Sequence, residues 1–599
     1  MSLGGISLLE LAQPPEGYRT TGGLVTTYSA DLIACLAVLV ALDGNGSDQL
    51  KYNKIEALRA LERLRNSVRI VVQQNRVEWR NQGDARILGL FDSVLRSVPF
   101  DGRKKSFHPK VLLARQESKD NPDRYIFYVG SRNLTSSTAW DLGIGLVGYA
   151  RGTQTPGTRR LTNVPTFVAK ICTLIGEPDF GRKLGRLGDI SWELPQDVDR
   201  LEFFFHAGTP RGIHQTELSA LPGRGKVLLV SPFLTPSMVE HAARHFAKAE
   251  SVRLVSVTSS LDKIAASKAR KYFRGAGGSI GVYSMALGTD DAPVQPRENG
   301  LEESESERGL HAKVFCVTDG YRARAIVGSA NLTHHAWLGA NWEAFVTLHG
   351  SEELVTELWD WSGTRAHPYK IPNIPEIKQE KRDPIDDLRN ELAEIEIRLV
   401  DVADCSSRLM SEQLPAILKR SGCVLNVARF TKPALWVRWN CEESEVLLPP
   451  CELGERTAFV CVRARKGEIE ATWVQTVRVD PPLNEERDRQ AFVRILGVED
   501  FLSYLQSLIN NLEFDGIERD NDDEAEKGNS PRTKNQNPFH LEDLLRKLNR
   551  DPRSMDELDQ TIVRYRDLFE RAPMLPDERN RLLHFISLWA AISTGMRMV

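Results

Sequence analysis

The sequence predicts an α/β fold of two pseudo-symmetric halves, followed by a small β module and a helical C-terminal region. A His-x-Lys motif followed by Gly-Ser-x-Asn occurs twice, in the same order. The strand-like segments that precede the motif are also repeated, as an internal duplication requires. Further along, residues 423–479 alternate apolar and polar residues in short runs, which is typical of strands. At 599 residues the chain exceeds one core, since domains hold about 100 to 200 residues.

The first half begins with strand and helix patterns that lead to the first motif. The expected elements are a strand at 23–29, an apolar helix from about Asp31, an amphipathic helix at 54–65, and strands at 68–72, 111–113 and 125–129. Ser29 or Asp31 is the expected cap of the apolar helix. The last strand ends at Gly130-Ser131, so the motif lies on a turn held by a rigid sheet.

The second half repeats this order. Residues 226–230 with Ser231-Pro232-Phe233 resemble the strand end at Tyr28-Ser29, and residues 251–254 echo residues 67–70. An acidic insertion at 290–307 accounts for the longer spacing before the second His-x-Lys. We hypothesise that this insertion competes for a basic groove and restrains the site.

Composition then changes along the chain. The expected units are a first half at 1–205, a second half at 206–373, a helical linker at 374–415, a β module at 416–485, and a helical C-terminal region at 486–599 with a disordered acidic linker at 515–537. The net charge of −3 divides into a basic part before residue 374 and an acidic part after it. The basic part contains both motifs.

Several function classes are disfavoured. No N-terminal targeting signal is present, and no apolar stretch reaches the ~18 residues that span a bilayer, so we expect a cytoplasmic protein with no membrane partner. The sequence contains no Gly-x-x-x-x-Gly-Lys-Ser/Thr loop, so we do not expect an ATP-driven motor. Cys423, Cys441, Cys451 and Cys461 lie in one region, where strand positions are favoured over a metal site. We therefore expect no metal and no other cofactor.

The two motifs predict a site for a phosphodiester. His108, Lys110 and Asn133 form the first set, and His311, Lys313 and Asn331 form the second. Cleaving a phosphodiester requires a positive cradle, a nucleophile and a proton donor for the leaving oxygen. A histidine can be the nucleophile in one copy and the acid in the other, because its ordinary pKa is ~6.5. If His-x-Lys lies on a strand, both side chains point to one face.

Other residues near the motifs are expected to support this site. The hydroxyls of Ser131 and Ser329 can donate hydrogen bonds to phosphate oxygens. Glu343 can hold one histidine by its second ring nitrogen, as the third member of a catalytic triad does, and Asp141 is its weaker counterpart. Trp140 and Trp337, each a few residues past its Asn, are expected to be packing anchors rather than base-stacking platforms.

Two groups of basic residues are candidates for binding the substrate. Arg103, Lys104 and Lys105 precede the first motif, and Lys268, Arg270 and Lys271 belong to a basic run in the second half. A basic helix face can contact a nucleic-acid backbone, or it can be a solvated surface. The sequence leaves both interpretations open for the second group.

The paired motifs resemble those of the phospholipase D superfamily, over roughly residues 20–370. The resemblance implies two α/β/α halves with their motifs facing, and a covalent phosphohistidine formed on one histidine. It implies His108 as nucleophile, His311 as general acid, and a phosphate held by the lysines and asparagines. The family pattern has an Asp five residues after the Lys, where this chain has Arg115 and Thr318. This departure favours the nuclease and tyrosyl-DNA phosphodiesterase branch over lipid hydrolases.

We therefore expect a metal-independent phosphodiesterase that cleaves nucleic acid, most plausibly DNA. The resemblance extends this to bacterial DNA processing or defence against foreign DNA. Two alternatives remain open: a phospholipase or phosphatidyl transferase, and a catalytically degenerate nucleic-acid-binding subunit of a larger complex. A helicase or other partner docking on the acidic C-terminal region is compatible with either nucleic-acid interpretation.

Overall fold

A computed structural model gives the conformation of the chain. It describes residues 7–44, 54–79, 84–137, 139–150, 158–159, 161–208, 213–286, 309–372, 383–402, 405–510, 553–571 and 576–597. The acidic insertion at 290–307 and the acidic linker at 515–537, both singled out from the sequence, lie outside these described residues.

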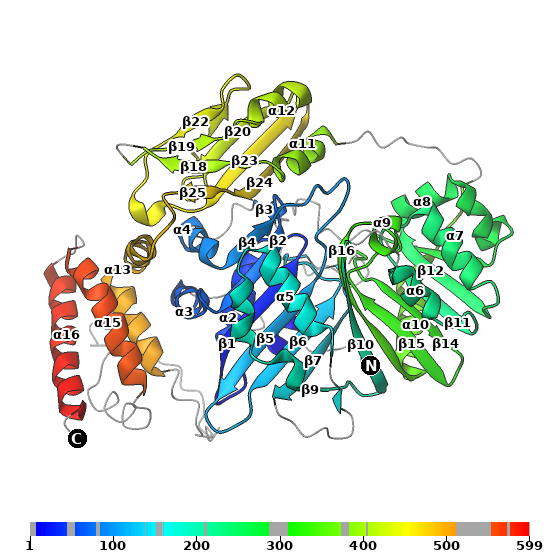
Figure 1. The fold of residues 1–599 in the computed structure, drawn as a ribbon, viewed down its shortest axis with the longest axis horizontal. Helices are drawn as coiled ribbons and strands as arrows, with labels where there is room; N and C mark the ends of the chain where they lie inside the picture. Colours follow the sequence, from blue (N-terminus) through cyan, green and yellow to red (C-terminus); the bar gives the residue numbers. More distant parts are fainter. Residues whose placement is uncertain are drawn as a thin grey trace, which may run out of the picture.

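The first half is built on an eight-stranded mixed sheet in the order β4-β2-β1-β5-β6-β7-β9-β8 (Figure 1). Its strands are β1 Tyr18–Thr27, β2 Val68–Gln73, β4 Leu95–Val98, β5 Val111–Ser118, β6 Arg124–Gly130, β7 Gly143–Ala150, β8 Thr158–Arg159 and β9 Ile190–Glu193. Its helices are α1 Leu8–Ala12, α2 Leu32–Leu42, α3 Lys54–Leu64, α4 Ala85–Gly89 and α5 Val164–Leu174. Asp31 caps α2 by accepting a hydrogen bond from the backbone N–H of Ala34 at 2.6 Å.

The second half is built on another eight-stranded sheet, in the order β10-β16-β15-β14-β11-β12-β13-β17. Its strands are β10 Val198–Ala207, β11 Lys226–Val230, β12 Ser251–Val257, β13 Ile280–Met285, β14 Val314–Thr318, β15 Arg322–Gly328, β16 Trp342–Ser351 and β17 His367–Pro368. Its helices are α6 Ile213–Ala220, α7 Pro236–His245, α8 Thr258–Ala265, α9 His334–Trp337 and α10 Glu353–Arg365.

The two sheets share one pattern of strand pairing. In the first, β1 pairs parallel with β2 and antiparallel with β5, and β5, β6 and β7 continue antiparallel. In the second, β11 pairs parallel with β12 and antiparallel with β14, and β14, β15 and β16 continue antiparallel. The predicted fold class of two pseudo-symmetric α/β halves is confirmed.

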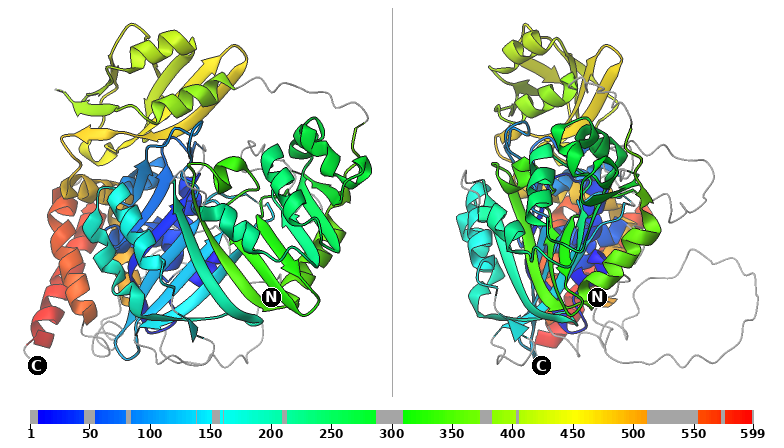
Figure 2. Two further views of the ribbon diagram at one scale, coloured as in Figure 1. Left: turned by 45° about the vertical axis from the view of Figure 1, so that its right-hand side comes forward. Right: turned by 90° about the vertical axis from the view of Figure 1, so that its right-hand side faces the viewer.

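The inner faces of both sheets share one hydrophobic core. It contains Leu113 and Phe127 from the first sheet and Leu228 and Val346 from the second. The outer face of the first sheet packs against α2 and α3, and that of the second against α7 and α8. In Figure 2 the long strands β10 and β16 run where the halves meet. The shared core also includes Phe167 of α5 and Leu354 of α10, so helices lie on both faces of the sheets, as expected of an α/β protein.

Strand β10 crosses the expected boundary between residues 205 and 206. All of its pairing is with β16, from Val198 opposite Gly350 to Ala207 opposite Trp342. By hydrogen bonding, the second sheet therefore begins at Val198, shortly after β9 ends the first.

A β module follows the two halves. It contains α11 Pro384–Leu392, β18 Arg398–Asp401, β19 Ser407–Met410, α12 Leu414–Ser421, β20 Val424–Arg429, β21 Val437–Trp439, β22 Glu445–Leu448, β23 Phe459–Lys466, β24 Ile469–Thr476 and β25 Arg478–Asp480. Strands β18 and β19 lie inside the segment expected to be a helical linker, and they form a four-stranded sheet with β22 and β25.

The module also takes a strand from the first half. Strand β3, Val77–Glu78, pairs antiparallel with β24 and completes the five-stranded sheet β21-β20-β23-β24-β3. Next to β3, the Gln74 amide donates a hydrogen bond to the backbone carbonyl of Thr476 at 2.8 Å. The module is therefore joined to the first half through a shared sheet.

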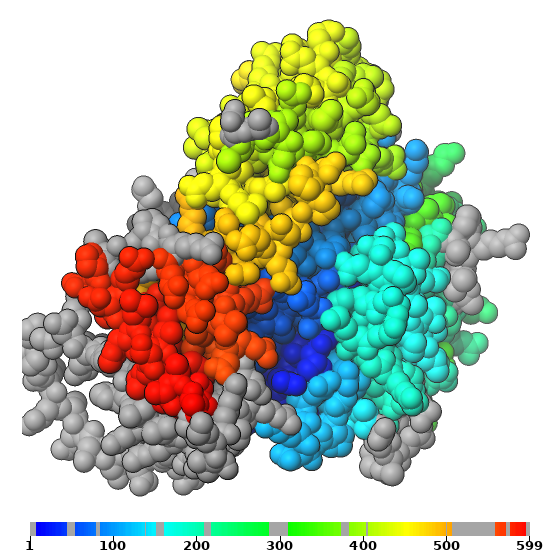
Figure 3. All heavy atoms as spheres, turned by 60° about the vertical axis from the view of Figure 1, so that its left-hand side comes forward, coloured from blue at the N-terminus to red at the C-terminus, as the bar shows by residue number. Residues whose placement is uncertain are grey.

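The C-terminal region is helical, as predicted. Its helices are α13 Glu485–Asn510, α15 Arg553–Arg571 and α16 Pro576–Arg597. The module and these helices lie against the first half (Figure 3). Arg487 of α13 forms a buried ion pair with Asp92 at 2.6 Å, and Arg564 of α15 pairs with Glu62 at 2.6 Å. Among the described helices, none is long and apolar enough to cross a membrane.

Candidate active site

The two His-x-Lys sequences occupy equivalent extended segments. His108 and Lys110 lie just before β5, and His311 and Lys313 lie just before β14, rather than within these strands. Each buried lysine donates a hydrogen bond from Nζ to the backbone carbonyl of its own histidine, at 3.0 Å in the first half and 2.7 Å in the second. This bond holds each ammonium group beside its histidine. From the sequence, the alternation of side chains along a strand was instead expected to bring the two together.

Each histidine is held by a carboxylate from the opposite half. Nδ1 of His108 lies 2.9 Å from Oε2 of Glu343, and Nδ1 of His311 lies 2.6 Å from Oδ1 of Asp141. In both pairs the carboxylate accepts a hydrogen bond from Nδ1–H, and this tautomer places the lone pair for chemistry on Nε2. The crossing makes each catalytic pair depend on both halves.

The motif serines orient these carboxylates. The hydroxyl of Ser131 donates to Oδ1 of Asp141 at 2.8 Å, and the hydroxyl of Ser329 donates to Oε2 of Glu343. Both serines are fully buried. They were expected to bind phosphate oxygens, whereas the structure shows them as hydrogen-bond donors to the acids that hold the histidines.

Backbone hydrogen bonds also cross between the halves. The N–H of His108 donates to the carbonyl of Trp342 at 3.0 Å, and the N–H of His311 donates to the carbonyl of Trp140 at 2.9 Å. Trp140 and Trp342 are therefore equivalent, each directly before its carboxylate. The sequence comparison had paired Trp140 with Trp337, which is instead fully buried and donates from Nε1 to the carbonyl of Asn331 at 2.8 Å.

The motif asparagines are bound to equivalent strand ends. Oδ1 of Asn133 accepts from the hydroxyl of Thr27 at 3.5 Å, and Oδ1 of Asn331 accepts from the hydroxyl of Ser231 at 3.3 Å. The same hydroxyls accept the backbone N–H of the residue after each asparagine, at 3.1 and 2.9 Å. Because the amide oxygens are bound in this way, the NH₂ groups of Asn133 and Asn331 are the parts of these side chains that could donate hydrogen bonds to an anion.

Burial and neighbouring charges set the ionisation of the first histidine. Burial, with help from Lys110 and Lys313, lowers the pKa of His108 to about 4, although Glu343 opposes the shift. Burial raises the pKa of Glu343, but the contacts with His108, Ser329 and Lys110 outweigh it and leave the pKa below its ordinary value. At neutral pH His108 is therefore a neutral imidazole beside an ionised carboxylate.

The second carboxylate is also ionised. Burial raises the pKa of Asp141, but the interactions with His311, then Lys313 and Arg132, outweigh it, so the pKa lies below its ordinary value. Asp141, 2.6 Å from Nδ1 of His311, holds this ring as Glu343 holds the ring of His108.

Tyr28 and Arg76 were not identified from the sequence. The ring of Tyr28 lies 5.4 Å from that of His108, and the guanidinium of Arg76 lies 5.4 Å from the Tyr28 ring. Arg76 is paired with Asp386 of the β module at 3.0 Å. The strand end at Tyr28 was noted as a repeat, but its contact with His108 depends on tertiary packing that no sequence pattern reports.

The basic residues before the first motif serve partly to attach the module. Arg103 pairs with Asp101 at 2.8 Å and with Glu391 of α11 at 3.2 Å. Lys104 is exposed and lies 3.4 Å from Asp101, and Lys105 lies over an aromatic ring.

The second basic group lies on the outer layer. Lys268, Arg270 and Lys271 form most of a 3₁₀ helix, Lys268–Tyr272, which packs against α7 and α8. Helix α8 covers the outer face of the second sheet, away from the shared core. The structure therefore does not bring this group together with the facing motifs.

The described residues contain no cluster of metal-ligating side chains: nowhere among them do three or more His, Cys, Asp or Glu side chains lie close enough to hold a metal ion. Cys423, Cys451 and Cys461 are buried in the β module, and Cys441 is half-buried. Cys461 lies on β23, as expected for an apolar strand position.

Comparisons with known proteins find similarity only at the level of solved structures. No protein-family profile matches the chain, and no curated protein does. The chain is similar to polyphosphate kinase from Porphyromonas gingivalis (15% identity, TM-score 0.33), with 61% of this chain and 49% of that chain covered. It is similar to phosphatidylserine synthase from Haemophilus influenzae Rd KW20 (11% identity, TM-score 0.35), with 64% and 89% covered. It is also similar to yeast tyrosyl-DNA phosphodiesterase (13% identity, TM-score 0.32), with 57% and 84% covered.

These proteins are members of the phospholipase D superfamily, the family that the paired motifs resemble. The match spans about half the length of the polyphosphate kinase. At these identities and TM-scores the similarity indicates nothing about the substrate of this chain. Its chemistry has to be argued from its own site.

Proposed function

We propose that this chain is a phosphodiesterase of the phospholipase D superfamily that cleaves nucleic acid through a covalent phosphohistidine. The observation that supports this most is the crossed pairing of His108 with Glu343 and of His311 with Asp141. A chain that used only one motif would not need two histidines that are each oriented by a carboxylate of the opposite half.

In the first step, Nε2 of neutral His108 attacks the phosphorus atom. The bond from phosphorus to the leaving oxygen breaks, and that oxygen takes the proton from Nε2 of His311. The product is a phosphohistidine on His108. Glu343 stabilises the positive charge that develops on the His108 ring, and Asp141 orients the His311 ring by its Nδ1 atom.

In the second step, a water molecule replaces the departed product. His311, now neutral, takes a proton from the water as its oxygen attacks the phosphorus atom, and the bond from phosphorus to Nε2 of His108 breaks. The ammonium groups of Lys110 and Lys313 and the amides of Asn133 and Asn331 would stabilise the charge on the non-bridging oxygens in both steps. No residue of this scheme requires a metal ion.

Nucleic acid is the favoured substrate class. Tyr28 places an aromatic ring beside His108, and an aromatic ring next to cations can stack against a base. Arg115 stands where the lipid-type family pattern has its Asp, and it pairs with Asp123 at 2.8 Å on the sheet. The alternative, a phospholipase or phosphatidyl transferase, lacks a comparable supporting contact. Roles in DNA processing or defence, and docking of a helicase on the C-terminal region, stay predictions.

The test is cleavage by the purified full chain in excess chelator. Single-stranded DNA, double-stranded DNA, RNA and phosphatidylcholine vesicles are offered to the wild type, His108→Ala and His311→Ala, with His241→Ala as a control on a surface helix. Chelator-resistant cleavage of nucleic acid that only the two motif substitutions abolish is the expected result. Cleavage of the lipid alone would favour the phospholipase. Nucleic-acid binding without turnover would identify a degenerate binding subunit.

A further inference from the structure

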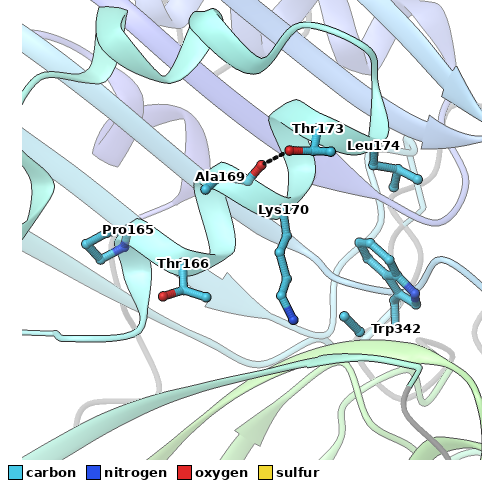
Figure 4. Close-up of a pocket in the computed structure, with 8 residues that line it drawn as sticks. Pro165, Thr166, Ala169, Lys170, Thr173, Leu174 and Trp342 are labelled. Carbon is cyan, nitrogen blue, oxygen red and sulfur yellow. Dashed lines mark hydrogen bonds between the residues drawn. The ribbon is translucent and has the colours of Figure 1, made fainter.

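A pocket of about 710 Å³ lies between α5 and the start of β16. Figure 4 shows Ala169 and Leu174 from α5 and the indole of Trp342 in its walls. Ala207, at the end of β10, also lines the pocket. The small side chains of Ala169 and Ala207 leave the space beside the indole open. Pockets of about 300 to 1,000 Å³ with mostly apolar walls are typical of sites for small ligands.

One charged side chain reaches into this pocket. Lys170 extends from α5 toward β10 and β16, and Thr166 lies on the same side of the helix (Figure 4). Among the residues that line the pocket, Lys170 alone has a charge. An indole ring, apolar walls and a single ammonium group suit a flat ligand that bears one anionic group.

The counterpart of Trp342 in the other half has different neighbours. Helix α10 places the ring of Trp361 at 6.1 Å and the guanidinium of Arg365 at 5.5 Å from the ring of Trp140. Trp342 packs against the rings of Phe100, Phe107 and Phe205, at 5.6 to 6.0 Å. The residues of α5 that line the pocket beside Trp342 include no aromatic ring.

The pocket is also joined to the histidine site through one residue. The carbonyl of Trp342 accepts the N–H of His108 at 3.0 Å, and the next residue, Glu343, holds the His108 ring. A ligand that stacks on the indole therefore contacts the residue that connects both.

We propose that this pocket binds a nucleoside 5′-phosphate, with the base stacked on Trp342 and the phosphate paired with Lys170. Stacking of a base on an aromatic side chain contributes about 1 to 3 kcal/mol. The ligand is either a free nucleotide or one unit of a nucleic-acid strand, and both present the same chemistry. The choice of a nucleotide rests on the proposed function, while the pocket and its lysine do not.

The test is calorimetric titration of the full chain with deoxyadenosine 5′-monophosphate, deoxyadenosine and decyl phosphate. Lys170→Ala removes the charge, Ala169→Phe fills the pocket from an exposed helix position, and Lys183→Ala is the matched control. We expect binding of the nucleotide to weaken at least tenfold in the first two variants and to stay unchanged in the control. We also expect removal of the phosphate to weaken binding in the wild type but not in Lys170→Ala.

A short oligodeoxyadenylate distinguishes the two sources of the ligand. If the pocket holds a unit of a strand, Ala169→Phe weakens binding of the oligonucleotide as well as binding of the monophosphate. If the pocket holds a free nucleotide, Ala169→Phe weakens binding of the monophosphate alone. Tighter binding of decyl phosphate than of the nucleotide, or equal nucleotide binding by the wild type and both pocket variants, would overturn the proposal. The His108→Ala variant must still bind the nucleotide. If the wild type cleaves no nucleic acid but binds the nucleotide in a way that depends on Lys170, the proposed nuclease is refuted and the proposed pocket is retained.

Discussion

The two halves of this protein contain the same site residues but differ in what surrounds them. Around the motifs three kinds of contact have counterparts in both halves: lysine to histidine carbonyl, serine to carboxylate, and carboxylate to the histidine across the interface. Farther out, the first half is joined to the β module and the C-terminal helices, and the second half has no such attachment among the described residues. The symmetry is retained where both histidines must meet one phosphate.

The surroundings of the two histidines also differ. His108 is packed beside Tyr28, and burial, with two lysines near it, lowers its pKa to about 4. His311 faces Asp141 at the shorter distance of 2.6 Å. Because surroundings as well as motif set what a histidine can do, we propose that His108 is the nucleophile and His311 the acid.

The strongest test of this assignment replaces each histidine in turn. His108→Ala should lose at least about 10⁴-fold in kcat on every substrate, because no nucleophile remains. His311→Ala should lose about 10²- to 10⁴-fold on a nucleic acid but much less on a p-nitrophenyl phosphodiester, whose leaving oxygen needs no proton. Steady-state kinetics on both substrates measure this. The reverse pattern would exchange the two roles.

The next effect concerns the crossed carboxylates. Asp141→Asn and Glu343→Gln should each lower kcat by about 10²- to 10⁴-fold, because an amide can hold the wrong tautomer of the histidine. Only the Asp141→Asn loss should shrink with the p-nitrophenyl substrate, since this carboxylate serves the acid. Double variants with the partner histidine should show little further loss, whereas additive losses would contradict the pairing.

Attachment of α13 to the first half should matter for stability. Arg487→Ala leaves Asp92 buried without its charged partner, which should cost about 3 to 5 kcal/mol in the free energy of unfolding. Arg478→Ala breaks an exposed pair with Glu396 and should change the free energy of unfolding by less than about 1 kcal/mol. Urea denaturation followed by circular dichroism compares the two variants. Equal, small changes would show that α13 contributes little to the stability of the first half.

The smallest effect is on the acid side of the pH profile. Because the pKa of His108 lies at about 4, below its ordinary value, the ring stays neutral from pH 7 down to about 5 and gains a proton only as pH falls through about 4. The kcat/KM of the free enzyme should therefore decline with an apparent pKa near 4 rather than near 6.5. A decline of kcat/KM already between pH 7 and pH 6 would mean that neutral His108 is not the nucleophile.

The sequence was sufficient for the duplication and both motifs, because identical residue types recur in identical order. It could not reveal that Glu343 and Asp141 cross, since that depends on the packing of one half on the other. Trp140 and Trp337 each follow their asparagine by a few residues, but α9 forms a helical turn after Asn331, and the structural equivalent of Trp140 is Trp342. Ser131 and Ser329 were expected to bind phosphate oxygens because the sequence does not show that the strand ends bury their hydroxyls.

Short strands in the C-terminal part were also beyond the sequence. Strand β3 has two residues, and β18 and β19 have four each, too few for a convincing alternation of apolar and polar positions. The segment expected to be a helical linker therefore concealed part of a sheet. The longer pattern from 423 to 479 did identify the module.

The pairing of β3 with β24 has a consequence for synthesis of the protein. The Gln74 side chain and its partner Thr476 are 402 residues apart in the chain. At a synthesis rate of about 5 to 20 residues per second, the first half waits about 20 to 80 s on the ribosome before the strand that completes this edge is made. During that time β3 is an unpaired edge that can pair with another nascent chain. We infer that a nascent chain stopped before residue 470 is an aggregation hazard rather than a functional smaller enzyme.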